Sequence, residues 1–121
     1  MPAPDDWIEV RRSTDRERVG WLRAEGDEWM PIDILGRDLP DGPRDWDRAE
    51  RALDDLGLSF LAERWELDTP DGPIPVRIVE VSDERIVVIR DDFGAASAII
   101  PGMARDERVL PWPAPEGLRL R

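Results

Sequence analysis

Residues 74–91, with the sequence IPVRIVEVSDERIVVIRD, decide the fold class of this chain. Both halves of the stretch are rich in valine and isoleucine, and apolar residues fall on both faces of each half. Strands of this kind lie inside a sheet that is covered on both sides. The polar residues Ser82, Asp83 and Glu84 suit the tight turn between them. The stretch therefore predicts two neighbouring strands, over 74–81 and 85–91.

Working outward, shorter patterns of β-branched and alternating apolar residues predict further strands on either side. These strands cover residues 7–12, 18–24, 28–35, 59–67 and 95–100. The segments 18–24 and 28–35 flank a turn at Gly26, which predicts a second hairpin. Pro31 has no N–H to donate, so its strand is expected at a sheet edge or at a bulge.

One helix is predicted over residues 45–56, within the sequence DWDRAERALDDLG of residues 45–57. The apolar residues recur with helical spacing and predict a buried stripe of Trp46, Ala49, Leu53 and Leu56. Asp45 is a suitable N-cap, and Gly57 suits the residue that ends the helix.

With hairpins dominating and one helix, the fold class is α+β. We expect a twisted, mainly antiparallel sheet of about six to seven strands, which could roll into a small barrel, with the helix at about 45–56. A chain of 121 residues suits a single domain over 1–121. The segments 1–6 and 113–121 are predicted to be flexible ends.

The chain has none of four residue types that often act in catalysis, namely His, Cys, Lys and Tyr. Their absence removes the histidine base, the thiolate nucleophile, the Schiff-base lysine and the phenolic acid from any mechanism. Catalysis would depend on Asp and Glu, alone or with a hard metal ion, and no segment has the spacing of a calcium loop. We therefore predict a protein that is not an enzyme and that has no cofactor and no catalytic or metal-binding residues.

The formal net charge is −11, and most of the acidic excess lies in residues 1–73, which carry 20 acidic residues and 10 arginines. This charge opposes binding to nucleic acid and to anionic lipid. The plain interpretation is a solvated surface that aids solubility. The alternative is an acidic face that docks a partner protein with a basic surface or mimics nucleic acid. The start of the chain has no signal-peptide pattern and no apolar run is long enough to cross a bilayer, so we expect a bacterial cytoplasmic protein.

The six tryptophans are far more than usual for a chain of this length. Core packing is the plain interpretation of these rings, and an aromatic binding platform is the functional one. The side chains predicted as possible partner contacts are Trp7, Trp21, Trp29, Trp65, Trp112, Asp33 and Arg37. We expect Asp33 on the solvent face of an edge strand, with a buried acid of raised pKa as the alternative.

Two further motifs have plain interpretations. Asp92, Phe93 and Gly94 form the triplet that holds magnesium in protein kinases, but the chain has no lysine, so a β-turn over 90–94 is expected. The proline-rich segment 110–115 favours polyproline II. It either docks in a groove on another protein or lies across its own domain with Trp112 as the anchor.

Three functions follow from these residues. The first is a non-enzymatic acidic module that regulates or binds another protein. The second is a small-molecule binder with a pocket lined by tryptophan, and the third, the least supported, is a carboxylate- or metal-dependent hydrolase.

Overall fold

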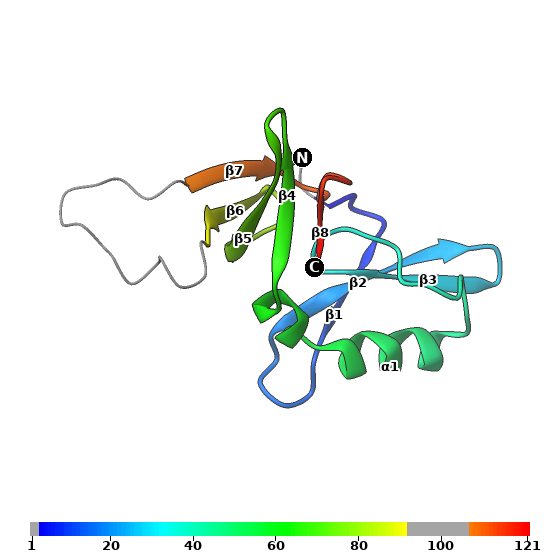
Figure 1. The fold of residues 1–121 in the computed structure, drawn as a ribbon. Coiled ribbons are helices and arrows are strands. Elements are labelled where there is room, and N and C mark those ends of the chain that lie inside the picture. The colour runs from blue at the N-terminus through cyan, green and yellow to red at the C-terminus, as the bar shows by residue number, and fades with distance from the viewer. Residues whose placement is uncertain (1–2, 92–106) are drawn as a thin grey trace.

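The computed structural model describes residues 3–91 and 107–121, and its first three strands form one antiparallel sheet (Figure 1). These strands are β1 (Ile8–Arg11), β2 (Arg18–Glu25) and β3 (Glu28–Asp33), in the order β1-β2-β3. The predicted hairpin is confirmed, since β2 pairs with β3 and Gly26 takes a φ of 63° in the turn between them. Pro31 lies on the edge strand β3, as its missing N–H predicts.

The helix α1 (Trp46–Leu56) confirms the prediction for this segment. The Asp45 side chain accepts the N–H of Arg48 at 2.8 Å, and the N–H of Gly57 donates to the Leu53 carbonyl at the other end. The helix packs on the three-stranded sheet through a small cluster of buried residues, namely Val10, Val19, Leu22, Ala49 and Leu53.

The prediction that Trp46 lies in the core with the rest of the helix stripe is wrong. Trp46 is 36% exposed, and its ring meets the half-buried ring of Trp29 edge-on at 4.9 Å between centroids. Trp46 is the first residue of the helix, so it extends past the end of the cluster that Ala49 and Leu53 form against the sheet.

The remaining described strands form a five-stranded antiparallel sheet in the order β7-β6-β5-β4-β8 (Figure 1). They are β4 (Trp65–Thr69), β5 (Gly72–Val81), β6 (Arg85–Arg90), β7 (Glu107–Pro111) and β8 (Leu118–Leu120). The predicted strands over 74–81 and 85–91 are therefore confirmed as β5 and β6. They lie inside the sheet, as their apolar residues predict.

The structure differs from the sequence predictions at three places. The segment Ser59–Ala62 forms a 3-10 helix, η1, in which the Leu61 N–H donates to the Leu58 carbonyl, where a strand over 59–67 was predicted. A strand, β7, forms over Glu107–Pro111, where none was predicted. The segment 113–121, predicted as a flexible end, contains β8, which pairs with β4. Residues 65–67 of the strand predicted over 59–67 do lie in β4. At the three places that differ, tertiary packing overrides the local pattern or adds a strand that the local pattern does not predict.

The predicted strand over 95–100 and most of the predicted turn over 90–94 lie outside the described residues. The possible barrel is not formed by the described strands, which make two open sheets. In 3–91 and 107–121, no helix is both long enough and apolar enough to cross a bilayer.

A common core joins the two sheets. The first sheet and the turn after it contribute Trp21, Ile32, Ile34 and Leu35, and the second sheet and its connections contribute Trp65, Leu67, Val76, Ile86, Val88, Trp112 and Leu118. The fold is therefore α+β, with two antiparallel sheets packed on one core and α1 on the outside of the smaller sheet.

Candidate functional site

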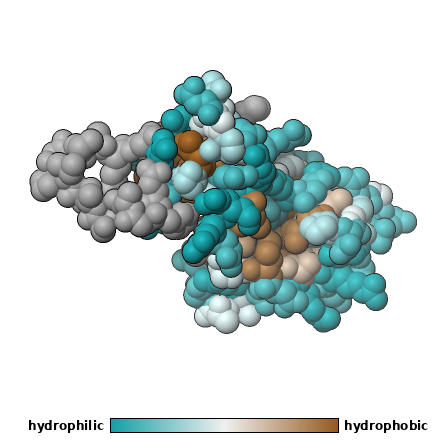
Figure 2. All heavy atoms as spheres, in the orientation of Figure 1, coloured by the Kyte–Doolittle hydropathy of each residue, from teal (hydrophilic) through white to brown (hydrophobic). Residues whose placement is uncertain are grey.

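An open groove of about 270 Å³ lies where the two sheets and the helix meet. Its walls are mainly apolar and come from five different parts of the chain: Leu35, Leu39, Leu56, Phe60, Trp65 and Leu120. Figure 2 shows apolar atoms gathered on this face between β8 and α1, with hydrophilic side chains around them. Leu120 is 51% exposed, although apolar residues of this size are usually buried.

The segment 33–37 forms one side of the groove and is held by Asp33, the last residue of β3. One carboxylate oxygen of Asp33 accepts the N–H groups of Leu35 at 2.9 Å and Arg37 at 3.1 Å. The backbone N–H of Asp33 donates to the Arg37 carbonyl at 2.9 Å, which closes the turn. The backbone therefore turns sharply after Asp33, and this turn brings Leu35 into the groove.

The prediction that Asp33 lies on the solvent face is wrong. Its side chain is partly buried against the groove, and burial raises the pKa of the Asp33 carboxyl above its ordinary value of 3.8. The hydrogen bonds from the N–H groups of Arg37 and Leu35 oppose this rise in pKa without cancelling it. The structure therefore combines the raised pKa of the alternative interpretation with a side chain that is only partly buried.

Because the pKa of Asp33 is raised, the free energy of unfolding should depend on pH. The folded state holds this proton more tightly than the unfolded state does, so ionisation of Asp33 lowers the free energy of unfolding as pH rises from 3.8 through the raised pKa. Asp33→Asn keeps the oxygen that accepts the two N–H groups and cannot ionise. We therefore expect this variant to be at least as stable as the wild type at about pH 7.

The two proteins should converge at about pH 4, where the wild-type carboxyl takes up its proton. Thermal unfolding of both proteins across this pH range measures the difference. A wild type that is more stable than Asp33→Asn at pH 7 would contradict the prediction, because the ionised carboxylate would then stabilise the turn.

Arg37 ties this turn to the C-terminal segment. Its Nη2 donates to the Pro115 carbonyl at 2.6 Å and also to the Leu118 carbonyl. Since Leu118 begins β8, Arg37 connects the smaller sheet to the edge of the larger one. The guanidinium that the sequence suggested as a partner contact therefore already binds two backbone carbonyls.

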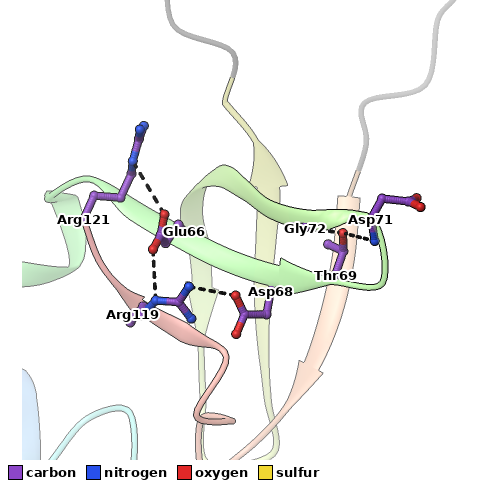
Figure 3. Close-up of polar contacts among 7 residues, drawn as sticks. All are labelled: Glu66, Asp68, Thr69, Asp71, Gly72, Arg119 and Arg121. Atoms are coloured by element: carbon purple, nitrogen blue, oxygen red, sulfur yellow. Dashed lines mark hydrogen bonds and ion pairs between the residues drawn. The ribbon is translucent and has the colours of Figure 1, made fainter.

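The other cation of the groove, Arg119, is held in a network on β4 and β8 (Figure 3). Its Nε donates to Glu66 at 2.9 Å and its Nη2 donates to Asp68 at 2.7 Å. This pairing lowers the pKa of Asp68 below its ordinary value. Arg121 also approaches Glu66, at 4.0 Å, so four charged side chains form one network, of which Arg119 lines the groove.

Asp38 also lines the groove and is paired with Arg23. The guanidinium of Arg23 donates two hydrogen bonds of 3.1 Å to the two carboxylate oxygens of Asp38. Asp33 is different, since within residues 3–91 and 107–121 it forms no ion pair closer than 4 Å and is held by backbone N–H groups.

Three of the predicted contact tryptophans form a cluster away from the groove. Trp21 and Trp112 are 3% and 4% exposed, and their ring centroids lie 5.1 Å apart. Trp7 is half-buried and contacts both rings, at 6.3 Å and 6.2 Å between centroids. Trp112 anchors the proline-rich segment on its own domain through a hydrogen bond of 3.0 Å from its Nε1 to the Ile34 carbonyl. The core interpretation of Trp21 and Trp112 thus agrees with the structure.

The other two predicted tryptophans lie in different places. Trp29 packs against Trp46 at the far end of the helix. Trp65 is in the wall of the groove, and its Nε1 donates to the Phe60 carbonyl at 3.2 Å. The groove therefore brings together Asp33, Arg37 and Trp65 out of the predicted contacts.

Sequence reasoning missed the leucines of the groove. Leu39 has a visible signal, because it is the one large apolar residue between Gly36 and Arg44, in a segment predicted as a loop. Leu56 was assigned to the buried stripe of the helix, and Leu120 belongs to the predicted flexible end. Their positions in one groove depend on long-range packing, which periodicity does not report.

Comparisons with known proteins leave the family of this chain open. No protein-family model matches it, and neither curated proteins nor solved structures include a significant match. Within the described part of the chain, no three His, Cys, Asp or Glu side chains are grouped so that they could hold a metal ion.

Proposed function

We propose that this protein is a cytoplasmic binding module whose groove receives an apolar side chain of a partner protein. The observation that carries the proposal is the open apolar groove with Leu120 half exposed at its edge. Exposed apolar surface that is rimmed by charged residues is typical of interaction sites. The groove is built by β3, α1, η1, β4 and β8 together with the segment 35–40 that follows β3.

The size of the groove favours a side chain of a partner over a free small molecule. Small-molecule sites usually enclose about 300–1,000 Å³ and bury most of their ligand. The groove of about 270 Å³ lies at the small end of this range and is open to solvent, which suits one or two anchoring side chains of a protein partner.

The polar groups of the groove favour binding over catalysis. Arg119 and Asp38 are engaged in ion pairs, and Arg37 is engaged with backbone carbonyls. The Asp33 carboxyl is held by two N–H groups in the turn, and the lining contains no hydroxyl or thiol nucleophile beside it. Groups that are held in this way by their own chain can orient a partner that enters the groove.

The test is affinity capture with matched variants. Leu120→Asp places a charge in the groove at an exposed position, and Val109→Asp makes a similar change at a residue that is 62% exposed on β7. The wild type and both variants are used as baits in lysate of the source organism, and bound proteins are quantified by mass spectrometry. We expect a partner that the wild type and Val109→Asp retain equally and that Leu120→Asp loses by about tenfold or more.

Circular dichroism and unfolding curves of the three baits check that they are equally folded. A partner that all three baits retain would place the interface elsewhere, and the absence of any partner that meets the criterion would count against the proposal.

A second candidate function is a small apolar ligand bound against Trp65, which is favoured by the aromatic wall that Trp65 and Phe60 form, with ring centroids 6.4 Å apart. A metabolite panel that changes the tryptophan fluorescence of the wild type, but not that of Trp65→Phe, would support it. A flat response of both proteins would exclude the panel members.

A further inference from the structure

We infer that the segment that fills the groove is an extended peptide of the partner protein, which adds to the edge of β8 and carries an arginine or lysine that pairs with Asp33. This inference rests on the proposed function and specifies the chemistry of the partner. Two independent observations carry it, namely the direction of the backbone groups of β8 and the charges that surround the groove.

The hydrogen-bond ladder between β4 and β8 shows which residues of β8 face outward. The N–H of Asp68 donates to the Gly117 carbonyl, and the N–H of Arg121 donates to the Arg64 carbonyl. In an antiparallel pair, alternate residues bond to the neighbouring strand, so Leu118 and Leu120 direct their N–H and C=O groups away from β4.

The outward N–H and C=O groups of Leu118 already form hydrogen bonds within the chain. Its N–H donates to the Pro115 carbonyl at 3.0 Å, and its carbonyl accepts from Arg37. Leu120 is the next outward residue, and its side chain lines the groove. A strand that enters the groove can therefore pair with the backbone of Leu120 while it places an apolar side chain against Leu39, Leu56 and Phe60.

The charges of the groove favour a partner segment that carries a positive charge. Arg119 and Asp38 are already paired with opposite charges of this chain, and the Arg37 guanidinium donates to two backbone carbonyls. Asp33 is the carboxyl of the groove that the described residues leave without an ion pair within 4 Å. A cation that enters with the peptide gains a partner there, and the net charge of −11 favours the approach of a basic segment.

The experiment uses the whole protein and pools of capped pentapeptides of the form Xaa-Val-Arg-Val-Xaa, where Xaa is a mixture of Leu, Ile, Met and Phe. Matched pools replace the arginine by citrulline, which has the same shape without the charge, or by glutamate. A fourth pool keeps the arginine and carries N-methyl groups on both valines, which removes two backbone donors. Binding is followed by the methyl NMR signals of Leu56 and Leu120 at low salt.

In the wild type we expect the arginine pool to bind about fivefold more tightly than the citrulline pool and the glutamate pool to bind most weakly. The N-methylated pool should also bind more weakly than its parent. The Asp33→Asn variant should bind the arginine pool and the citrulline pool with about equal affinity. Asp41→Asn is the matched control, since it removes one exposed acid outside the groove at a φ of 78°, which asparagine tolerates, and it should keep the preference.

Each result decides a separate part of the inference. Equal binding of the arginine and citrulline pools to the wild type would overturn the pairing with Asp33, and full binding of the N-methylated pool would overturn the addition to β8. In both cases the proposed function survives, because the apolar groove still binds. If no pool shifts the signals of Leu56 and Leu120 at millimolar concentration, the inference and the groove as a protein-binding site both fail. The comparison of arginine with citrulline needs only the wild type, so it stands even if Asp33→Asn is poorly folded.

Discussion

The substitution Gly20→Ala is expected to lower the free energy of unfolding by about 4 kcal/mol or more. Gly20 lies in the middle of β2, between Val10 of β1 and Asp33 of β3. A β-carbon built at Gly20 would lie 2.0 Å from the Ile32 carbonyl oxygen and 3.0 Å from the Leu53 Cδ2 atom. The oxygen belongs to the backbone of the paired strand, so the clash can be relieved only by moving β3 away from β2. That movement would also disturb the turn at Asp33 that shapes the groove.

Urea unfolding of the wild type, Gly20→Ala and Gly26→Ala measures this effect. Gly26 is the matched control, because a β-carbon there meets nothing within 4 Å and its φ of 63° costs an alanine only about 1–2 kcal/mol. A loss below about 1 kcal/mol for Gly20→Ala would mean that the two strands are not packed as closely as the structure shows.

The second large effect is expected for Trp112→Ala, which should cost about 3–5 kcal/mol of unfolding free energy. The ring is 4% exposed, contacts the rings of Trp7 and Trp21 edge-on, and lies in the core that joins the two sheets. Its removal leaves a large cavity and also leaves the Ile34 carbonyl without its hydrogen bond of 3.0 Å. Since Ile34 lies in the turn after β3, the loss should extend to the position of that turn.

Two further substitutions separate the effect of losing the buried ring from the effect of losing the hydrogen bond. Trp112→Phe keeps an aromatic ring and removes the N–H donor, so it should cost less than Trp112→Ala. Trp46→Ala removes a tryptophan that is 36% exposed, and we expect a loss of about 1 kcal/mol. Chemical unfolding of the three variants gives these free energies, and equal losses for Trp46→Ala and Trp112→Ala would contradict the assignment of Trp112 to the core.

The same tertiary contacts stabilise the fold and shape the candidate site. Arg37 binds the carbonyls of Pro115 and Leu118, and Trp112 binds the carbonyl of Ile34. The N–H of Ala114 also donates to the Leu35 carbonyl at 2.8 Å. The C-terminal segment is therefore attached to the turn after β3 at several points, and these attachments help to bring Leu120 into the same groove as Leu39.

The elements that sequence predicted well are those in which local chemistry agrees with the final packing. The helix over 45–56 has an N-cap at Asp45, a glycine at its end and a regular apolar stripe, and it forms almost as predicted. The hairpins around Gly26 and over residues 82–84 likewise have turn residues and β-branched neighbours that favour the same structure. Asp33 and Arg37 line the groove, and their role as partner contacts stays a prediction.

The elements that sequence missed depend on residues far away in the chain. Leu118–Leu120 pair with Leu67, Glu66 and Trp65, which lie about fifty residues earlier, and three residues carry too short a pattern to predict a strand. Trp46 follows the helical spacing but lies beyond the buried cluster, and spacing does not report where the facing sheet ends.

Local propensity, turn residues and hydrophobic periodicity were thus enough to predict the fold class, the helix and the main hairpins, because these signals act over a few neighbouring residues. Tertiary structure alone decided that Leu39, Leu56 and Leu120 share one groove, that Trp21 and Trp112 are core residues, and that Asp33 is partly buried beside the groove. Burial and the meeting of distant side chains depend on how the two sheets pack, and that packing minimises exposed apolar area over the whole chain. No single segment contains this information.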